Sequence, residues 1–411
     1  MRHRFPLRTL VAVIIVSIAT AGVVAAQEVR VMTRNLFIGA DLNPVLAAQT
    51  PAEFAAAVQT TLTQIAASDF PKRAELFADE IASKRPHLVG LQEVTRLTLN
   101  GTTGALPFRD YLDDVLSALE ARGAYYYVAG VVNDLDVTLP IPGVGVIETL
   151  DRDVVLARVD VGASPVTVPG CRVSVNGCNF SVFVSAPTPF GSSIAVERGF
   201  VVVDAIVDGQ PVRIVNTHLE IPELPVIVQS LQAAELIARV SALPIAPNSP
   251  VIVVGDINSA PTDVPTVPGV VPPYMQLAAH YADVWDLRPG APLGFTCCSD
   301  SLSDPQFQAF KRVDVIFTSG SPVIARAIVV GGRSADTYGA MGFGPPRRVW
   351  PDPIREVKAV DSNRALSWAI RVSVSRPRSA LRWGRRLILT KHQNGIDARR
   401  ATRRHVGRQQ G

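Results

Sequence analysis

The sequence predicts a single large α/β sandwich, and three observations support this fold class. Apolar, strand-like runs alternate with amphipathic, helix-like segments along most of the 411 residues, of which 47% are hydrophobic. Some strand pairs are joined by tight turns, whereas others flank a helix, so hairpins and strand–helix–strand units are mixed. No internal repeat interrupts this pattern. A sandwich with mixed sheets therefore fits better than a strictly alternating parallel fold.

The first part of the chain is expected to contribute two strands and three helices. Pro51 favours a helix start and Gly123 a helix end, because proline suits the first helical position and glycine the C-terminal stop. The predicted elements are a strand at 28–36, helices at 51–70 and 72–83, a short buried strand at 87–94 and a helix at 108–123.

The second part is expected to contribute mostly strands, with two of them joined by an Asp-Gly turn. The predicted elements are strands at 153–161, two strands within 200–219, a helix at 224–242, and strands at 251–256, 312–319, 325–332 and 365–374. Residues 333–359 are rich in Gly, Pro and charge and predict a long loop. Residues 375–411 lack apolar periodicity and predict a basic, disordered tail, so the domain is expected to span 27–374.

The N-terminal segment has the layout of a secretory signal peptide. Arg2, Arg4 and Arg8 precede an apolar run that ends in small residues before Gln27. The segment 1–26 is therefore predicted to be removed, and the mature protein to be secreted, periplasmic or extracellular. The alternative is an uncleaved membrane anchor, although the run is short for a span of about 20 residues.

Four cysteines are compatible with export. Cys171 and Cys178 flank a predicted hairpin, "RVSVNG", which favours a local disulfide between them. Cys297 and Cys298 are adjacent, and either a strained bridge between them or pairing with other cysteines is open.

Charge is distributed unevenly along the chain. The formal net charge is +4, but residues 373–411 carry eleven basic residues and one acid, and residues 1–26 carry three arginines. Residues 27–372 keep 26 basic and 35 acidic residues, a formal charge of −9. An acidic body argues against tight non-specific binding of nucleic acid, although the basic tail could attract polyanions in a salt-dependent way.

Polar side chains recur where predicted strands end or begin. We expect them to converge at one edge of a core sheet. They are Asn35 in "TRNL", Glu93 in "LQEV", His218 in "NTHL", Asp256 and Asn258 in "VIVVGDIN", and Asp314 in "RVDVIF".

This set has the side chains that cleavage of a phosphate ester requires. Hard divalent cations bind through one or two carboxylates, waters and the substrate phosphate, which suits Glu93 with Asn35 and predicts Mg²⁺, with Mn²⁺ or Ca²⁺ as alternatives. Asp256 suits the base that activates water, and Asn258 can donate a hydrogen bond to phosphate without adding like charge. His218 can donate to a phosphate oxygen or protonate a leaving group.

The motifs T-x-N-L, L-Q-E-V, N-T-H-L, G-D-x-N and R-x-D-x-I-F, in this order, resemble the endonuclease/exonuclease/phosphatase superfamily over roughly residues 28–320. The resemblance implies a four-layer α/β sandwich, two mixed β-sheets packed face to face with helices outside, and metal-dependent phosphoester hydrolysis. It places Asn35 and Glu93 at the metal site and His218, Asp256 and Asn258 at catalytic positions. Asp314 matches the aspartate of the penultimate motif.

One family motif is absent. Members normally carry Ser-Asp-His before the last strand, and no such triplet follows Asp314. "VDSNRALSWAI" places Asn363 at the equivalent position, while a second alignment uses "WPDPI" at 350–354. Three explanations are open: a weakened or inactive member, a tail histidine that folds back, or a shifted reading frame after about residue 333.

The sequence thus predicts an exported, metal-dependent phosphoester hydrolase, phosphodiesterase- or nuclease-like, with no protein partner and a monomeric state. The substrate is expected to be nucleic acid, a phospholipid or a small phosphate ester. Two alternatives are a sphingomyelinase- or phospholipase C-like enzyme and a catalytically weakened, exported binding module.

Overall fold

The computed structural model describes residues 27–100, 106–288, 290, 293–297, 309–320, 323–330 and 367–374. The signal segment, the 333–359 segment, Cys298, Asn363 and the basic tail lie outside these residues. Within the described part, no helix is long and apolar enough to cross a membrane.

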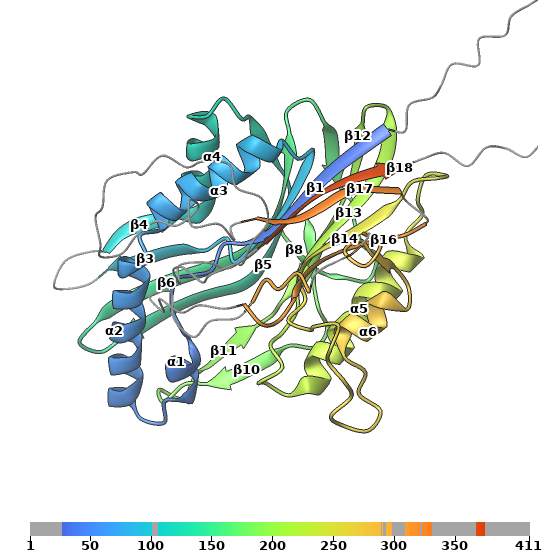
Figure 1. The fold of residues 1–411 in the computed structure, drawn as a ribbon. Coiled ribbons are helices and arrows are strands. Elements are labelled where there is room, and N and C mark those ends of the chain that lie inside the picture. The colour runs from blue at the N-terminus through green and yellow to red at the C-terminus, as the bar shows by residue number, and fades with distance from the viewer. Residues whose placement is uncertain are drawn as a thin grey trace, which may run out of the picture. The chain divides into compact units, whose positions relative to one another are not determined.

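Two large mixed sheets form the centre of the fold (Figure 1). The first sheet has the order β17-β18-β1-β2-β6-β3-β4, with β5 paired to β6. Its strands are β1 (Gln27–Asn35), β2 (Leu88–Gln92), β3 (Arg96–Asn100), β4 (Leu106–Asp110), β5 (Tyr126–Ile141), β6 (Gly145–Arg158), β17 (Val323–Val330) and β18 (Ser367–Val374).

The second sheet has the order β15-β16-β14-β13-β12-β9-β8, with β7 paired to β12. Its strands are β7 (Gly162–Pro165), β8 (Arg172–Ser174), β9 (Gly177–Asn179), β12 (Gly199–Val207), β13 (Gln210–His218), β14 (Val251–Asp256), β15 (Ala282–Asp283) and β16 (Asp314–Thr318). A separate hairpin consists of β10 (Val184–Pro187) and β11 (Ser193–Val196).

Alternating side chains on the strands create the layers. On β1, Val29 and Val31 enter the core shared by both sheets, whereas Met32 packs outward against helices. The same alternation on β6 sends Val155 inward and Val154 outward. Because successive side chains of a strand point to opposite faces, each sheet can bury both of its faces.

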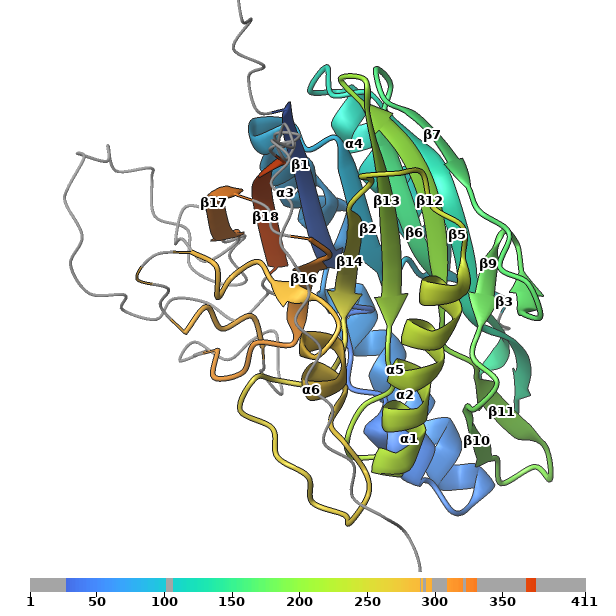
Figure 2. The same ribbon diagram turned by 90° about the vertical axis from the view of Figure 1, so that its right-hand side faces the viewer.

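Helices cover the two outer faces, which completes the four layers. Helices α3 (Phe70–Lys84) and α4 (Tyr111–Glu120) pack on the first sheet, and α5 (Val226–Ala242) and α6 (Pro273–Ala278) on the second. Figures 1 and 2 show these pairs on opposite sides of the sandwich. The predicted four-layer α/β sandwich is confirmed.

Two more helices, α1 (Asn43–Ala47) and α2 (Pro51–Ala67), pack beside β3, β5 and β6. The start of α2 follows from its sequence. Thr50 and Glu53 form a reciprocal capping box around Pro51, which satisfies amide groups that a helix end leaves free.

Most predicted segments are confirmed, but several strands were not predicted. The residues from 106 to 110 form β4 before α4 begins, although a single helix was predicted from 108. The long strand β5 was also missed, and it pairs with β6 along nearly its whole length. Residues 135–139, "LDVTL", alternate apolar and polar side chains, so the sequence carries a strand pattern that the prediction overlooked.

One predicted disulfide is confirmed. Cys171 and Cys178 are bonded across the β8–β9 hairpin, with Cα atoms 5.5 Å apart. Cys297 is also disulfide-bonded.

Candidate functional site

The polar strand ends meet between the two sheets. In the first sheet, parallel pairing puts Asn35 beside Gln92, directly before Glu93. In the second sheet, His218 pairs with Asp256, and Asp256 pairs with Asp314. The expectation that all of them lie at one edge of one sheet was wrong, because the face-to-face packing brings ends of two sheets together.

Asn35 links the two halves of this site. Its Nδ2 donates to Glu93 Oε1 at 2.8 Å and to Asp256 Oδ2 at 3.1 Å. Its Oδ1 accepts the Phe37 backbone N–H at 2.8 Å, which fixes the orientation of the amide. Glu93 Oε2 accepts the Ile38 N–H at 2.8 Å. A carboxylate from each sheet is thereby held against one amide.

The backbone around Asp256 explains why its motif requires glycine. Gly255 has φ +148°, and a Cβ there would lie 1.9 Å from the Thr217 carbonyl oxygen, so no other residue fits without a backbone shift. Asp256 Oδ1 then accepts the Asn258 N–H at 2.9 Å. Glu93 and Asn258 both have left-handed backbones, with φ +53° and +48°. Strained backbones of this kind concentrate at functional sites.

His218 lies between two nitrogen groups. Arg198 Nη1 is 2.8 Å from its Nδ1, and Asn258 Nδ2 is 3.2 Å from its Nε2. Arginine only donates, so Nδ1 must accept and the proton of a neutral ring is on Nε2. Burial, followed by the charge of Arg198, holds the pKa of His218 well below its usual value. The ring is therefore neutral at pH 7.

Asn258 is aligned as a second donor. Its Nδ2 donates to the Leu219 carbonyl at 2.9 Å, so the amide nitrogen faces the His218 Nε2–H. Two N–H donors that face each other do not satisfy one another. An incoming oxygen with lone pairs could accept from both groups.

Asp314 is buried beside Asp256. It is 2% exposed, and its Oδ1 has no hydrogen-bond partner. Burial, followed by the neighbouring Asp256, raises the pKa of Asp314 well above its usual value. Burial likewise raises the pKa of Asp256 to about 6, against the lowering effect of its hydrogen bonds from Asn258 and Asn35. An additional positive charge would stabilise both carboxylates.

More acidic residues surround the site than the motifs indicate. Asp134, Asp151, Asp153 and Glu220 come from β5, β6 and the segment after β13, and Arg198 lies among them. Arg198 Nη2 is 3.6 Å from Glu220. Burial lowers the pKa of Arg198, but the acidic neighbours, Glu220 first, outweigh burial and raise it above its usual value. None of the five was predicted from the sequence. The alternating acids of "TLDRDVV", directly before a buried apolar run, were the available signal.

Two of these acids, Asp134 and Asp153, lie close to His218 and form with it a compact set of side chains of the types that bind cations, although His218 Nδ1 is already taken by Arg198. One atom each from Asp134, Asp153 and His218 lies within 4.8 Å of the others. The carboxylate oxygens of Asp134 and Asp153 are buried and have no hydrogen-bond donor. Burial, followed by neighbouring carboxylates, raises the pKa of both well above its usual value. These two acids therefore favour a protonated or cation-bound state.

Other motif residues have structural roles. Gln92 Nε2 donates to Asn216 Oδ1 at 2.6 Å, and Asn216 Nδ2 donates to the carbonyls of Leu91 and Val154 at 2.9 and 3.1 Å. These bonds connect β13 to both β2 and β6 across the interior. In the R-x-D motif, Arg312 forms a buried ion pair with Asp283.

A comparison with known protein families gives a match over most of the chain. The model of the Endonuclease/Exonuclease/phosphatase family matches residues 64–337, two thirds of the chain. The chain belongs to the endonuclease/exonuclease/phosphatase family. This family includes metal-dependent phosphoesterases that act on substrates such as DNA. No curated protein matches the sequence significantly.

Three solved structures illustrate the similarity. An endonuclease/exonuclease/phosphatase from Beutenbergia cavernae matches 85% of this chain and 72% of its own, with 20% identity and a TM-score of 0.48. A mannosyl-6-phosphatase from Bacteroides thetaiotaomicron matches 84% of this chain and 99% of its own, with 15% identity and a TM-score of 0.47. The human Nocturnin catalytic domain matches 86% and 95%, with 14% identity and a TM-score of 0.44.

The residues of this family member fit a divalent cation. Glu93 and Asp256 are carboxylates held 2.8 and 3.1 Å from the same amide nitrogen, and Asp314 contributes a buried oxygen without a partner. Oxygen ligands of this type suit Mg²⁺, Mn²⁺ or Ca²⁺.

Proposed function

We propose that this chain is an exported, divalent-metal-dependent phosphoester hydrolase that acts on phosphodiesters. The observation that carries the proposal is the Asn35 amide, which joins Glu93 of one sheet to Asp256 of the other. This link assembles a metal-type carboxylate and a base-type carboxylate at one point. The order of motifs in the family supports the same assignment.

Glu93 and Asn35 would hold the cation. A bound Mg²⁺ would neutralise the phosphoryl oxygens and stabilise the charge that develops during cleavage. Carboxylates outnumber guanidinium groups near the site, and this excess of negative charge supports a cation-binding role. Arg198 is the basic residue in direct contact with His218.

Asp256 would accept the proton of the attacking water. A raised pKa of about 6 keeps this carboxylate mostly ionised at pH 7 and makes it a stronger base than a solvated aspartate. The hydrogen bonds from Asn35 and Asn258 fix both of its oxygens, so it is oriented before substrate binds. Asp314 pairs with Asp256 across the sheet and would limit both the position and the ionisation of the Asp256 carboxylate.

His218, Asn258 and Arg198 would bind the phosphate. The Nε2–H of His218 and the amide of Asn258 face the same space, and both can donate to a phosphoryl oxygen. The lowered pKa of His218 favours this donor role over proton transfer to a leaving group. Donors that are fixed in advance stabilise transition-state charge without reorganisation.

The missing Ser-Asp-His motif supports a second candidate function. Strand β18 is antiparallel to β1, and Trp368 pairs with Thr33, so β18 starts where β1 ends at the site. We propose that Asn363, four residues before β18, replaces the family histidine. An amide cannot carry the proton, and loss of an acid–base group reduces rates by about 10²–10⁴-fold. A weakened enzyme that acts as an exported phosphate-ester-binding module is therefore the alternative.

Hydrolysis of bis-p-nitrophenyl phosphate tests the proposal. We expect turnover in Mg²⁺, no turnover in EDTA, and a loss of about 10³-fold in kcat for Asp256→Asn. Asp113→Asn, a change of an exposed aspartate on α4, is the matched control and should retain activity. Turnover that survives both EDTA and Asp256→Asn would contradict the mechanism, and absence of turnover on a phosphoester panel would favour the binding module. A gain of activity in Asn363→His would support the placement of the missing motif.

We further propose that the chain is exported and processed before Gln27. The Cys171–Cys178 disulfide supports this, because disulfides persist mainly in oxidising compartments. Mass spectrometry of the protein from culture medium and cell fractions would test it. An N-terminus at Gln27 outside the cytoplasm is the expected result, and an intact, cell-retained chain would contradict it.

A further inference from the structure

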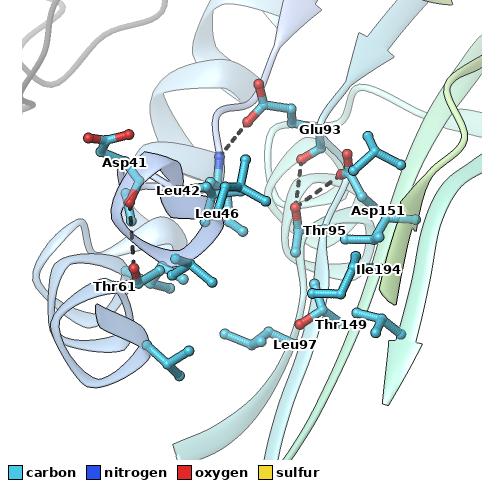
Figure 3. Close-up of a pocket in the computed structure, with 18 of the residues that line it drawn as sticks. Asp41, Leu42, Leu46, Thr61, Glu93, Thr95, Leu97, Thr149, Asp151 and Ile194 are labelled. Atoms are coloured by element: carbon cyan, nitrogen blue, oxygen red, sulfur yellow. Dashed lines mark hydrogen bonds between the residues drawn. The ribbon is translucent and has the colours of Figure 1, made fainter. Parts of the chain in front are cut away.

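A cavity of about 480 Å³ opens beside Glu93, and most of its lining is aliphatic or aromatic. It lies between α1 and α2 on one side and β3, β5, β6 and β11 on the other. Figure 3 shows Leu42 and Leu46 on the helical side and Leu97 and Ile194 on the strand side. The volume is within the range of small-molecule pockets, roughly 300–1,000 Å³.

The two ends of the cavity differ in chemistry. Glu93, Asp151 and Arg198 line one end, and Thr95 Oγ1 lies 3.2 Å from Asp151 Oδ1. Leu97 and Thr149 line the wall toward the other end (Figure 3). The polar end shares Glu93 and Arg198 with the proposed catalytic site, and the mostly apolar remainder extends away from these residues.

The apolar end is a preformed part of the fold. Its helical and strand walls are anchored by a buried cluster that includes Phe54, Val58, Leu62, Leu97 and Ile147. Helix α2 and strands β3 and β6 supply this cluster, so the cavity does not depend on a single loop. Preformed apolar cavities bind hydrocarbon without a large ordering cost.

A nucleotide suits this space poorly. A buried nucleobase needs several hydrogen-bond partners, but beyond the polar end the lining offers few polar side chains among many aliphatic ones, namely Asp41, Asn43, Thr61 and Thr149. The lining also includes four carboxylates near the polar end, and residues 27–372 carry a formal charge of −9. A polyanionic chain would be repelled, whereas one phosphate beside a cation would not.

We propose that the cavity binds the hydrocarbon chain of an amphiphilic phosphoester, with its phosphate at Glu93 and Asn35. This inference rests on the proposed function and adds a substrate class to it. The chain lies between α1–α2 and the strands, and the phosphate faces His218 and Asn258. Selectivity then comes from chain burial, which increases binding by about fourfold per methylene, equivalent to about 0.8 kcal/mol.

A chain-length series tests the inference directly. The purified chain is assayed in Mg²⁺ with methyl, butyl and octyl p-nitrophenyl phosphate, each below its aggregation concentration. Full burial of the seven additional methylenes would raise kcat/KM by about 10⁴-fold, so we expect the octyl ester to exceed the methyl ester by at least about 100-fold even when only half of the chain is buried. Equal kcat/KM across the series, with metal-dependent turnover intact, overturns the cavity assignment and leaves the proposed function standing.

Two pairs of variants locate the effect. Leu46→Glu places a charge in the cavity, and Leu231→Glu places one on exposed α5. Ile194→Trp fills the cavity, and Val159→Trp adds the same ring at an exposed position. The octyl-to-methyl ratio should fall about tenfold or more in the cavity variants and stay unchanged in the controls. A ratio that survives both cavity variants overturns the proposal.

Binding without turnover separates this proposal from the catalytic one. Calorimetry in Mg²⁺ compares octyl phosphate with inorganic phosphate on the unmodified chain and on Leu46→Glu. Tighter binding of octyl phosphate that Leu46→Glu removes supports the cavity even if no ester is hydrolysed. Equal affinity for both probes overturns it. A change in oligomeric state on Leu46→Glu, with chain preference intact, would instead assign the surface to a second copy of the chain.

A comparison of a dissolved ester with a lipid in vesicles distinguishes a soluble amphiphile from a membrane lipid. Monomeric octyl ester and phosphatidylcholine vesicles are compared as substrates at equal phosphoester concentration. Turnover of both supports a membrane lipid, and turnover of the monomeric ester alone supports a soluble amphiphile. If Leu46→Glu hydrolyses the vesicle lipid as fast as the unmodified chain does, the cavity is not the chain-binding site and the proposal is overturned.

Discussion

At the scale of single residues, the site depends on groups that the motifs reveal and on groups that only the fold reveals. Asp256, Asn258 and Glu93 follow buried strands, and the physical need for glycine at 255 is visible in the G-D-x-N pattern. Arg198 follows a glutamate and precedes a glycine in an ordinary sequence context. Its contact with His218 depends on the pairing of Gly199 with His218, which couples distant parts of the chain. No local pattern could have predicted that contact.

Arg198 is expected to be a main contributor to phosphate binding. Arg198→Lys keeps the charge but loses the fixed fork that contacts His218 and Glu220. We expect kcat/KM on bis-p-nitrophenyl phosphate to fall about 100-fold, as for removal of a preorganised donor. Arg122→Lys, which alters an outer ion pair with Asp79, is the matched control. Similar losses in both variants would contradict a specific role for Arg198.

His87 should make stability depend on pH. The Arg30 N–H donates to its Nδ1 at 3.0 Å, and burial, followed by the charge of Arg158, lowers its pKa to about 4. The folded state therefore binds fewer protons than the unfolded state between about pH 4 and pH 6.5. The contribution of the neutral ring is complete above pH 6.5 and is lost as the pH falls toward 4.

Urea unfolding at pH 7.5 and pH 4.5 measures this effect. His87→Gln keeps an acceptor for the Arg30 amide but does not titrate. The unfolding free energy of the unmodified chain should fall relative to His87→Gln by roughly 2 kcal/mol between these pH values. A difference that is the same at both pH values would show that His87 does not titrate as proposed.

At the scale of elements, strand patterns predicted most of the sheet, but not how the strands meet. Buried strand β14 starts with the continuous apolar run "VIVV", and β12 contains "FVVV", and both were predicted accurately. Strand β5 and the β10–β11 hairpin were missed, although each pairs with its neighbour in sequence through a short turn, β5 with β6 and β10 with β11. The missed cavity has a different cause, because its walls come from six separate elements. The two-sheet origin of the site also depended on packing that no single segment encodes.

The bonds of Asn216 should hold the two sheets in register. Asn216→Leu removes the side-chain donor to the Leu91 and Val154 carbonyls and the acceptor of one Gln92 N–H, while Gln92 keeps its bond to Thr33. Unpaired buried groups cost about 1–3 kcal/mol each, so we expect the unfolding free energy to fall by roughly 3 kcal/mol or more. Urea unfolding at pH 7.5 measures the change.

A double-mutant cycle distinguishes the interaction between Gln92 and Asn216 from an unrelated loss of stability. If Gln92 and Asn216 act as a pair, the double variant Gln92→Leu/Asn216→Leu should lose less unfolding free energy than the two single variants together. We expect the difference to be about 1 kcal/mol or more. Strict additivity would show that the two side chains stabilise the fold independently.

At the scale of the whole molecule, the fold places an excess of negative charge around one site. The sequence predicted the acidic body and the metal-type carboxylates, but not that carboxylates of both sheets and of β5 and β6 gather in one region. Their separation in sequence hides this. Only the packed structure shows that Asp134, Asp153 and Asp314 are buried with oxygens that lack a partner. Such an arrangement should be destabilised by its own repulsion until a cation binds.

Divalent cations should therefore stabilise the folded protein, whether or not it is an active enzyme. A ligand at 100 times its Kd adds about 2.7 kcal/mol when it binds only the folded state. For a chain of this size, we expect the thermal midpoint to rise by roughly 3–5 °C in saturating Mg²⁺ and to return to its starting value with EDTA. Glu93→Gln removes a proposed ligand and should abolish most of this shift. Glu120→Gln, an exposed change at the end of α4, should preserve it. If the thermal midpoint does not change with Mg²⁺, Mn²⁺ or Ca²⁺, the buried carboxylates are neutralised by protons. The proposed metal-dependent chemistry would then lose its physical basis.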